Sequence, residues 1–171
     1  MNLAELHILA AIRRAHRLKM RSIRDAIRYL SDHSDPGRGR DHPLISHGLE
    51  TDGWDLFVHR YGQLINASKG GQAAIREVVH AALKRIEYDA DGWPLKLYPF
   101  TRATVHNAPT MVVIDPTLSA GRPVIAGTGL ATQIIAERYK LGESISDLTY
   151  DYERPQEEIE EAIRCELHAA A

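Results

Sequence analysis

Residues 111–168 of the chain read MVVIDPTLSAGRPVIAGTGLATQIIAERYKLGESISDLTYDYERPQEEIEEAIRCELH. An apolar run at residues 111–115 opens this stretch and predicts a strand. The residues that follow, up to Gly129, are rich in Gly and Pro and predict a loop, within which Val124 and Ile125 predict a second short strand. The stretch therefore begins with a predicted strand-loop unit.

Three helical patterns follow this unit, and each has a recognisable start or end. The first covers residues 131–141 and is ended by Gly142. The second begins at Ser144, with Asp147 as its capping partner, and the third begins at Pro155. Three short helices with brief joins are typical of a helix-turn-helix bundle, and equally of helical bundles that do not bind DNA. The apolar residues of the three helices are Ile134, Ile135, Leu141, Ile145, Leu148, Ile159, Ala162, Ile163 and Leu167.

Residues 1–33 predict two further helices. Apolar residues at helical spacing cover residues 3–18, and a second stripe covers residues 22–33. Ser22, three residues before Asp25, predicts a capping box at the start of the second helix. The stripes of the first helix contain Leu3, Leu6, Ile8, Leu9, Ala10, Ile12 and Ala15. Helix spacing places three arginines of the second helix along one side, away from its apolar stripe: Arg21, Arg24 and Arg28.

The middle of the chain changes to strand-like spacing. Residues 54–60 and 63–67 predict two strands joined by a tight turn at Tyr61–Gly62. A helix follows Gly70–Gly71, and residues 93–100 predict an extended segment. The buried stripe of the middle helix is expected to hold Ile75, Val78, Val79, Ala82, Leu83 and Ile86.

These patterns together predict an α+β protein. It has an N-terminal helical segment, a small β-hairpin plus helix unit, and a C-terminal strand-loop plus three-helix bundle. The predicted domains are residues 1–40, 41–105 and 106–171.

Composition is ordinary for a globular protein, with 44% hydrophobic and 26% charged residues. No apolar run approaches the length of a membrane span, and charged residues interrupt the N-terminus, so we expect neither a membrane segment nor export. The single cysteine, Cys165, cannot form an intramolecular disulfide, which fits a reducing compartment. We therefore expect a cytoplasmic protein.

Charge is distributed unevenly along the chain, although the net charge is only −2. Residues 1–40 contain nine Lys and Arg against four Asp and Glu, whereas residues 141–171 contain two against nine. A basic N-terminal segment and an acidic C-terminal segment indicate surfaces for different partners, or else two solvated helix faces of opposite sign.

The C-terminal motifs resemble a known family. The segments Ile114-Asp-Pro, Gly121-Arg-Pro-Val-Ile-Ala-Gly-Thr128, Gly142-Glu-Ser-Ile and Asp151-Tyr152 resemble those of the VapB-type antitoxin family catalogued as domain of unknown function 433. The resemblance covers residues 111–168. It implies a homeodomain-like three-helix bundle and a partner that is a PIN-domain ribonuclease toxin.

Residues 1–33 resemble the rear half of a MerR-like DNA-binding domain. The whole chain therefore resembles an N-terminally shortened VapB antitoxin of the mycobacterial kind, and the resemblance implies that binding to operator DNA needs a longer N-terminus. Family members often carry arginine at the positions of Ala126 and Gly129, so that a phosphate-binding role for this loop is weaker here.

The basic N-terminal segment, residues 1–40, contains the predicted DNA surface. Neutralised phosphates supply most of the free energy of DNA binding, and the last helix is rich in glutamates, which would repel phosphate. An ordinary solvated helix face is the alternative. The predicted DNA-binding residues are Arg13, Arg14, Arg17, Arg21, Arg24 and Arg28.

Residues 111–171 contain the predicted toxin surface, because arginines such as those in this segment suit the carboxylates of an acidic ribonuclease site. An ordinary surface role is again the alternative for each candidate. The predicted toxin-binding residues are Arg122, Arg138, Arg154 and Arg164. We also expect a homodimer, in which an exposed strand edge at residues 111–114 pairs with its copy.

We expect no enzyme activity and no catalytic residues, cofactor or metal site. His42, His47 and His59 share one region but lack the close spacing of zinc ligands. Cys165 lies among glutamates, which raise the pKa of a thiol and lower its reactivity.

The leading hypothesis from the sequence is a non-enzymatic antitoxin that also represses its own operon. Two alternatives remain open. One is a stand-alone DNA-binding regulator without a toxin partner. The other is a small ligand-binding module or enzyme that uses the middle unit around Trp54, His59 and Trp93.

Overall fold

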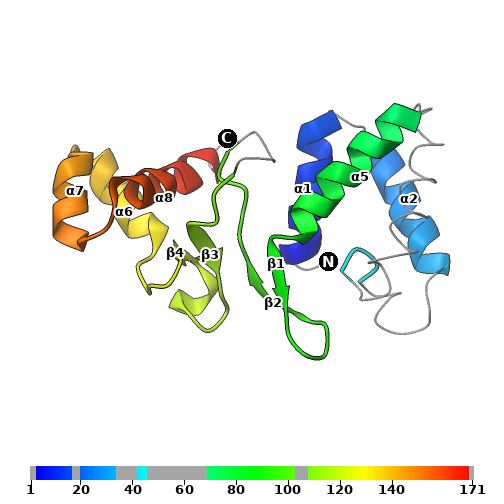
Figure 1. Ribbon diagram of the computed structural model, residues 1–171, viewed down its shortest axis with the longest axis horizontal. Helices are drawn as coiled ribbons and strands as arrows, with labels where there is room; N and C mark the ends of the chain where they lie inside the picture. Colours follow the sequence, from blue (N-terminus) through cyan, green and yellow to red (C-terminus); the bar gives the residue numbers. More distant parts are fainter. Residues whose placement is uncertain (1–2, 17–19, 34–41, 46–68, 103–107, 170–171) are drawn as a thin grey trace. The chain divides into compact units, whose positions relative to one another are not determined.

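The computed structural model divides into two compact units, Met1–Pro94 and Leu95–Ala171 (Figure 1). The part of the chain that it describes contains six α-helices and a four-stranded antiparallel sheet, which confirms the predicted α+β class. The division into domains at residues 40 and 105 stays a prediction. The described residues are 3–16, 20–33, 42–45, 69–102 and 108–169.

The N-terminal unit contains three helices: α1 (Leu3–His16), α2 (Met20–His33) and α5 (Lys69–Leu83). The helices α1 and α5 pack against each other. The buried residues of α1, α2 and α5 recur at helical spacing, which confirms both predicted N-terminal helices and the middle helix. The fully buried large side chains of this unit are Ile8, Ile12, Ile23, Leu30, Leu44 and Ile75.

Three details of this unit differ from the sequence predictions. The helix α2 begins at Met20, so that Ser22 is its third residue and does not occupy the position before its start. The buried side of α1 centres on Ile8 and Ile12, and a residue on its opposite side such as Leu6 is half exposed. Ile86 does not extend the stripe of α5, because the helix ends at Leu83 and Ile86 opens a strand.

A tight turn joins β1 (Ile86–Tyr88) to β2 (Pro94–Leu97). The Oδ1 atom of Asp89 accepts hydrogen bonds from the backbone nitrogens of Asp91, at 3.0 Å, and Trp93, at 2.7 Å. Gly92 has a φ of 76°, which a residue without a Cβ adopts without strain. The predicted extended segment at residues 93–100 is thus confirmed over β2, whereas the predicted hairpin at residues 54–67 lies outside the described residues.

The strand order is β1-β2-β3-β4, with β3 at Val112–Ile114 and β4 at Pro123–Ile125. Antiparallel registers join Leu97 to Ile114 and Val113 to Val124. The strand β3 therefore has a neighbour on both sides. This corrects the expectation that residues 111–114 form an exposed edge, since β3 lies between β2 and β4 in the sheet.

The C-terminal unit places three helices on one side of β3 and β4 (Figure 1): α6 (Thr132–Lys140), α7 (Ile145–Tyr152) and α8 (Gln156–Ala169). This confirms the predicted strand-loop unit followed by three helices. The helix α8 packs against both strands and both other helices. The core that they enclose consists of Ile125, Ile135, Leu148, Ile159, Ala162 and Ile163.

Three apolar residues predicted for the inner stripes are exposed instead. Ile135 takes the inner position of α6, and the neighbouring Ile134 is 49% exposed because adjacent helical residues point about 100° apart. Leu141 follows the end of α6 and is 85% exposed, and Leu167 on α8 is 45% exposed.

The start of α7 confirms its predicted capping box. Ser144 Oγ accepts a hydrogen bond from the backbone nitrogen of Asp147 at 3.1 Å, and the backbone nitrogen of Ser144 donates to Asp147 Oδ2 at 3.3 Å. Hydrogen bonds from the Ser144 side chain and backbone lower the pKa of Asp147. Just before, Gly142 has a φ of 102° and ends the preceding helix, as predicted.

We expect Ser144→Ala to lower the free energy of unfolding by about 1 kcal/mol, because it removes the acceptor for a backbone N–H at the start of α7. Chemical denaturation followed by circular dichroism measures the change. Ser146→Ala is the matched control, since Ser146 is exposed in the same helix and is not its cap. An equal loss in both variants would contradict the role of the cap.

Candidate functional site

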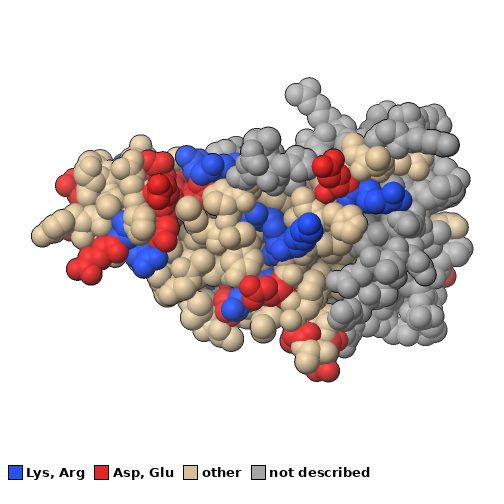
Figure 2. Space-filling view, viewed as in Figure 1, with Lys and Arg blue, Asp and Glu red and all other residues tan. Residues whose placement is uncertain are grey.

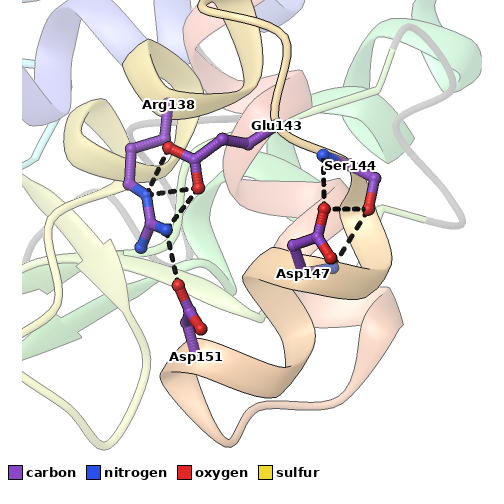
Figure 3. A network of polar contacts seen from close by, with 5 residues as sticks. All are labelled: Arg138, Glu143, Ser144, Asp147 and Asp151. Carbon is purple, nitrogen blue, oxygen red and sulfur yellow. Dashed lines mark hydrogen bonds and ion pairs between the residues drawn. The ribbon is translucent and has the colours of Figure 1, made fainter.

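Arg138 on α6 is held by carboxylates of its own unit (Figure 3). Its Nε atom donates to Glu143 Oε1 at 2.8 Å, and its Nη2 atom donates to Asp151 Oδ2 at 2.5 Å. The guanidinium also lies 5.1 Å from the ring centroid of Tyr152. The hydrogen bonds that Arg138 donates to Glu143 and Asp151 raise its pKa. This predicted toxin-binding residue therefore joins α6 to α7.

Two further arginines of the predicted toxin surface are engaged in the same way. Arg154 forms a two-pronged contact with Glu158, at 2.8 and 3.0 Å, and Arg164 pairs with Glu161. Figure 2 accordingly shows acidic and basic side chains next to one another on the C-terminal helices, without a broad field of one sign. Three of the four candidates thus have carboxylate partners within the fold.

Arg122 differs from these three arginines. It is exposed, and its side chain forms neither an ion pair nor a hydrogen bond with another residue that the structure describes. It lies immediately before β4, at the end of the turn that follows β3. Of the four predicted residues, Arg122 is the one whose guanidinium is presented to solvent without an internal carboxylate.

The turn before Arg122 is anchored by side-chain hydrogen bonds. Asp115 Oδ1 accepts hydrogen bonds from the backbone nitrogen of Thr117 at 2.8 Å and from its hydroxyl at 2.6 Å. These bonds hold the pKa of the Asp115 carboxyl below its usual value. Ser119 Oγ donates to the backbone oxygen of Gly129 at 3.0 Å and so ties the turn to the next loop.

The backbone of this turn adopts a left-handed conformation. Ser119 and Ala120 have φ values of 45° and 56°, and Gly121 follows at 74°. Left-handed geometry costs a residue with a Cβ about 1 kcal/mol, so the surrounding contacts must maintain it. Pro123 then restricts Arg122 to an extended backbone, with φ −77° and ψ 153°. The turn thus presents Arg122 from a fixed backbone.

Glu161 on α8 forms the polar centre of this unit. Its side chain is fully buried and accepts hydrogen bonds from Thr101 Oγ1 and from Arg102 Nη2, the latter at 2.8 Å, and it pairs with Arg164. Burial by itself raises the pKa of Glu161, but the hydrogen bonds from Arg102 and Thr101 and the charge of Arg164 outweigh it, so that the pKa lies below its usual value. Sequence patterns did not indicate Arg102 as a functional partner.

We expect Glu161→Gln to lower the free energy of unfolding at pH 7 by about 2 kcal/mol, since it removes one partner of a buried charged cluster whose arginines are still reached by water. Because the pKa of Glu161 is lowered in the fold, its stabilisation is complete above the ordinary glutamate pKa of about 4. It is lost as the pH falls through the lowered value.

Denaturation curves of the wild type and Glu161→Gln between neutral and acidic pH test this expectation. Glu157→Gln is the control, because Glu157 is exposed on the same helix. A difference in stability that stays constant down to the acidic end would show that the carboxylate charge is not what stabilises the unit.

The predicted DNA-binding arginines lie in the N-terminal unit. On α1, the side chain of Arg13 is exposed, Arg14 belongs to the helix, and Arg17 lies outside the described residues. The three arginines of α2 are all exposed, which confirms their predicted side: Arg21, Arg24 and Arg28. Binding to DNA itself stays a prediction.

Other candidate chemistry takes the following positions. His42 Nδ1 lies 3.3 Å from Glu5 Oε2, and its ring meets Trp93 edge-on at 6.0 Å between centroids. His47, His59 and Trp54 lie outside the described residues, so that the alternative in the middle unit stays a prediction. Within the described ranges, no three His, Cys, Asp or Glu side chains gather closely enough to hold a metal ion.

Burial, followed by the charges of Glu166 and Glu161, raises the pKa of the Cys165 thiol to about 11. The direction is the one predicted from the sequence, and it leaves the group a poor nucleophile. In the described part of the chain, every helix is too short or too polar to span a bilayer.

Comparisons with known proteins identify a similar structure and a family. The crystal structure of Rv2018 from Mycobacterium tuberculosis is similar, with a TM-score of 0.62 and 23% sequence identity, over 94% of this chain and 75% of that chain. At this identity the similarity shows the fold alone. No curated protein matches. Residues 112–164 match the model of a family described as "Protein of unknown function (DUF433)", which confirms the predicted resemblance over these residues, whereas its antitoxin aspect stays a prediction.

Proposed function

We propose that this chain is an antitoxin of a type II toxin–antitoxin system, which binds and neutralises a PIN-domain ribonuclease and represses its own operon by binding DNA. The observation that carries the proposal is Arg122, an exposed arginine on a constrained turn within the DUF433 segment. Its guanidinium is available to carboxylates of another protein.

Availability separates Arg122 from the other candidates. Arg138 and Arg154 would have to leave carboxylates at 2.5 to 3.0 Å before they could bind a partner, and each exchange would return little net free energy. Arg122 has no such exchange to make with a described residue. A guanidinium can bind a carboxylate through two parallel hydrogen bonds, and this geometry suits the acidic site of a ribonuclease.

Several further properties belong to the same proposal. The helices α6, α7 and α8 are taken as a homeodomain-like bundle that serves protein binding, because α8 begins with Glu157 and Glu158 and would repel phosphate. The protein would act as a cytoplasmic homodimer without enzymatic activity or a cofactor.

Co-expression with a PIN-domain ribonuclease from the same genome tests the proposal. We expect a tagged copy of this chain to retain the ribonuclease and to abolish its RNA cleavage. Arg122→Ala should weaken retention by about tenfold or more, which corresponds to the loss of one charge-assisted contact of about 1.4 kcal/mol. The free energy of unfolding should change by less than about 0.5 kcal/mol, as for other exposed positions.

Lys140→Ala is the control for a general loss of positive charge, since Lys140 is an exposed cation at the end of α6. Wild-type protein that leaves the ribonuclease unbound and active would refute the antitoxin proposal. Retention that is equally strong for the wild type and Arg122→Ala would refute the role of Arg122.

A stand-alone DNA-binding regulator is the second candidate, and it is favoured by the exposed arginines along α2. Fluorescence anisotropy with the DNA upstream of the gene, at stepwise increasing salt, tests it. Replacing Arg21, Arg24 and Arg28 together by alanine should reduce the slope of log K against log salt by about 3. An unchanged slope would exclude these residues as phosphate contacts, and DNA binding without retention of a ribonuclease would favour the second candidate over the first.

A further inference from the structure

An apolar groove of about 330 Å³ lies between α1 and α2 in the N-terminal unit. Leu9 and Ile23, both buried, contribute to its base, while Leu6 and Ile27 line it closer to solvent. The antitoxin proposal uses none of these apolar residues.

The apolar surface continues along α1 beyond the groove. Leu3 lies one turn before Leu6, and the two side chains are 51% and 50% exposed. From Leu3 to Ala10 the helix rises about 10 Å, which is close to two turns. Large aliphatic side chains that are exposed in a row beside a groove are typical of an interaction site.

Two arginines also line the groove, one from each helix. Arg13 belongs to α1 and Arg24 belongs to α2, and both side chains are exposed. Neither forms an ion pair with another described residue, and no acidic side chain among the described residues lines the groove. An occupant with carboxylates beside an apolar stripe would satisfy both the base and the arginines of the groove.

We propose that the groove between α1 and α2 binds an acidic amphipathic helix of a partner protein. Such a helix lays leucine-like side chains on Leu6, Leu9 and Ile23, and its glutamates or aspartates meet Arg13 and Arg24. Its polar face stays in water, which suits a groove whose wall residue Leu6 is itself half exposed.

The openness of the groove and its apolar base distinguish this occupant from two others. A small apolar ligand is normally enclosed over most of its surface, and a half-exposed wall would leave much of it in water. A DNA backbone offers phosphates to Arg13 and Arg24 but has no apolar side chain for the surface of Leu6 and Leu9. The apolar base together with Arg13 and Arg24 therefore favours an acidic amphipathic helix as the occupant.

The test uses the full chain, labelled with ¹⁵N, and two stapled helical peptides of about 15 residues. Both carry leucines at helical spacing, flanked by glutamates in one peptide and by lysines in the other. We expect the glutamate peptide to shift amide signals of α1 and α2 saturably and to bind at least about tenfold more tightly than the lysine peptide.

Variants at exposed positions separate the two contributions. Leu6→Glu should weaken the glutamate peptide by about tenfold or more, and the double variant Arg13→Glu, Arg24→Glu should reverse the preference in favour of the lysine peptide. Leu141→Glu and Lys140→Glu are the matched controls, because both residues are exposed in the C-terminal unit, and both variants should bind the peptides like the wild type. Circular dichroism confirms that each variant is folded.

Three results would overturn the proposal. One is an absence of saturable shifts with the glutamate peptide. Another is equal affinity for both peptides, since that would leave Arg13 and Arg24 without a role. The third is normal binding by Leu6→Glu together with loss of binding in the double arginine variant, because that pattern belongs to a surface for phosphates.

Discussion

The carboxylate of Glu161 sits inside the C-terminal unit with no exposed surface, where a charge without partners would cost several kcal/mol. Its partners come from two places: Arg164, one turn further along α8, and Thr101 with Arg102, about 60 positions earlier in the chain. Residues 101 and 102 must therefore lie against α8 for the charge to be tolerated. The helix α8 also contacts both strands and both other helices, so that the Glu161 cluster joins residues 101 and 102 to the element at the centre of the unit.

The same unit uses its arginines in two ways. Arg138, Arg154 and Arg164 each pair with a carboxylate of the fold, which offsets part of the acidic charge of the C-terminal helices. Arg122 is used differently. The left-handed turn at Ser119 and Ala120 fixes its backbone, and no described carboxylate pairs with its side chain. Strain that is maintained by hydrogen bonds elsewhere is a common way to preorganise a contact.

What the sequence allowed us to predict was local. Ser144 and Asp147 form a capping box because a helix start needs acceptors for its free N–H groups, and Gly142 ends a helix because it tolerates a positive φ. Which of Ile134 and Ile135 faces the core depends on where α8 lies, and spacing within α6 alone does not contain that information. The contact between Arg102 and Glu161 and the groove between α1 and α2 each involve two separate segments of the chain. Local sequence patterns do not show that these segments come together in the fold.

The proposed surfaces of the two units should respond differently to solution conditions. A contact made by Arg122 alone is electrostatic, so salt would weaken it and slow its formation. The α1–α2 groove combines apolar area with Arg13 and Arg24, so salt would remove the preference for acidic helices while the apolar contribution persists. Partner binding that persists at high salt but no longer prefers acidic helices would therefore belong to the groove. Partner binding that is lost at high salt would belong to the turn at Arg122. Ionic strength thus distinguishes the two surfaces even before either partner is known.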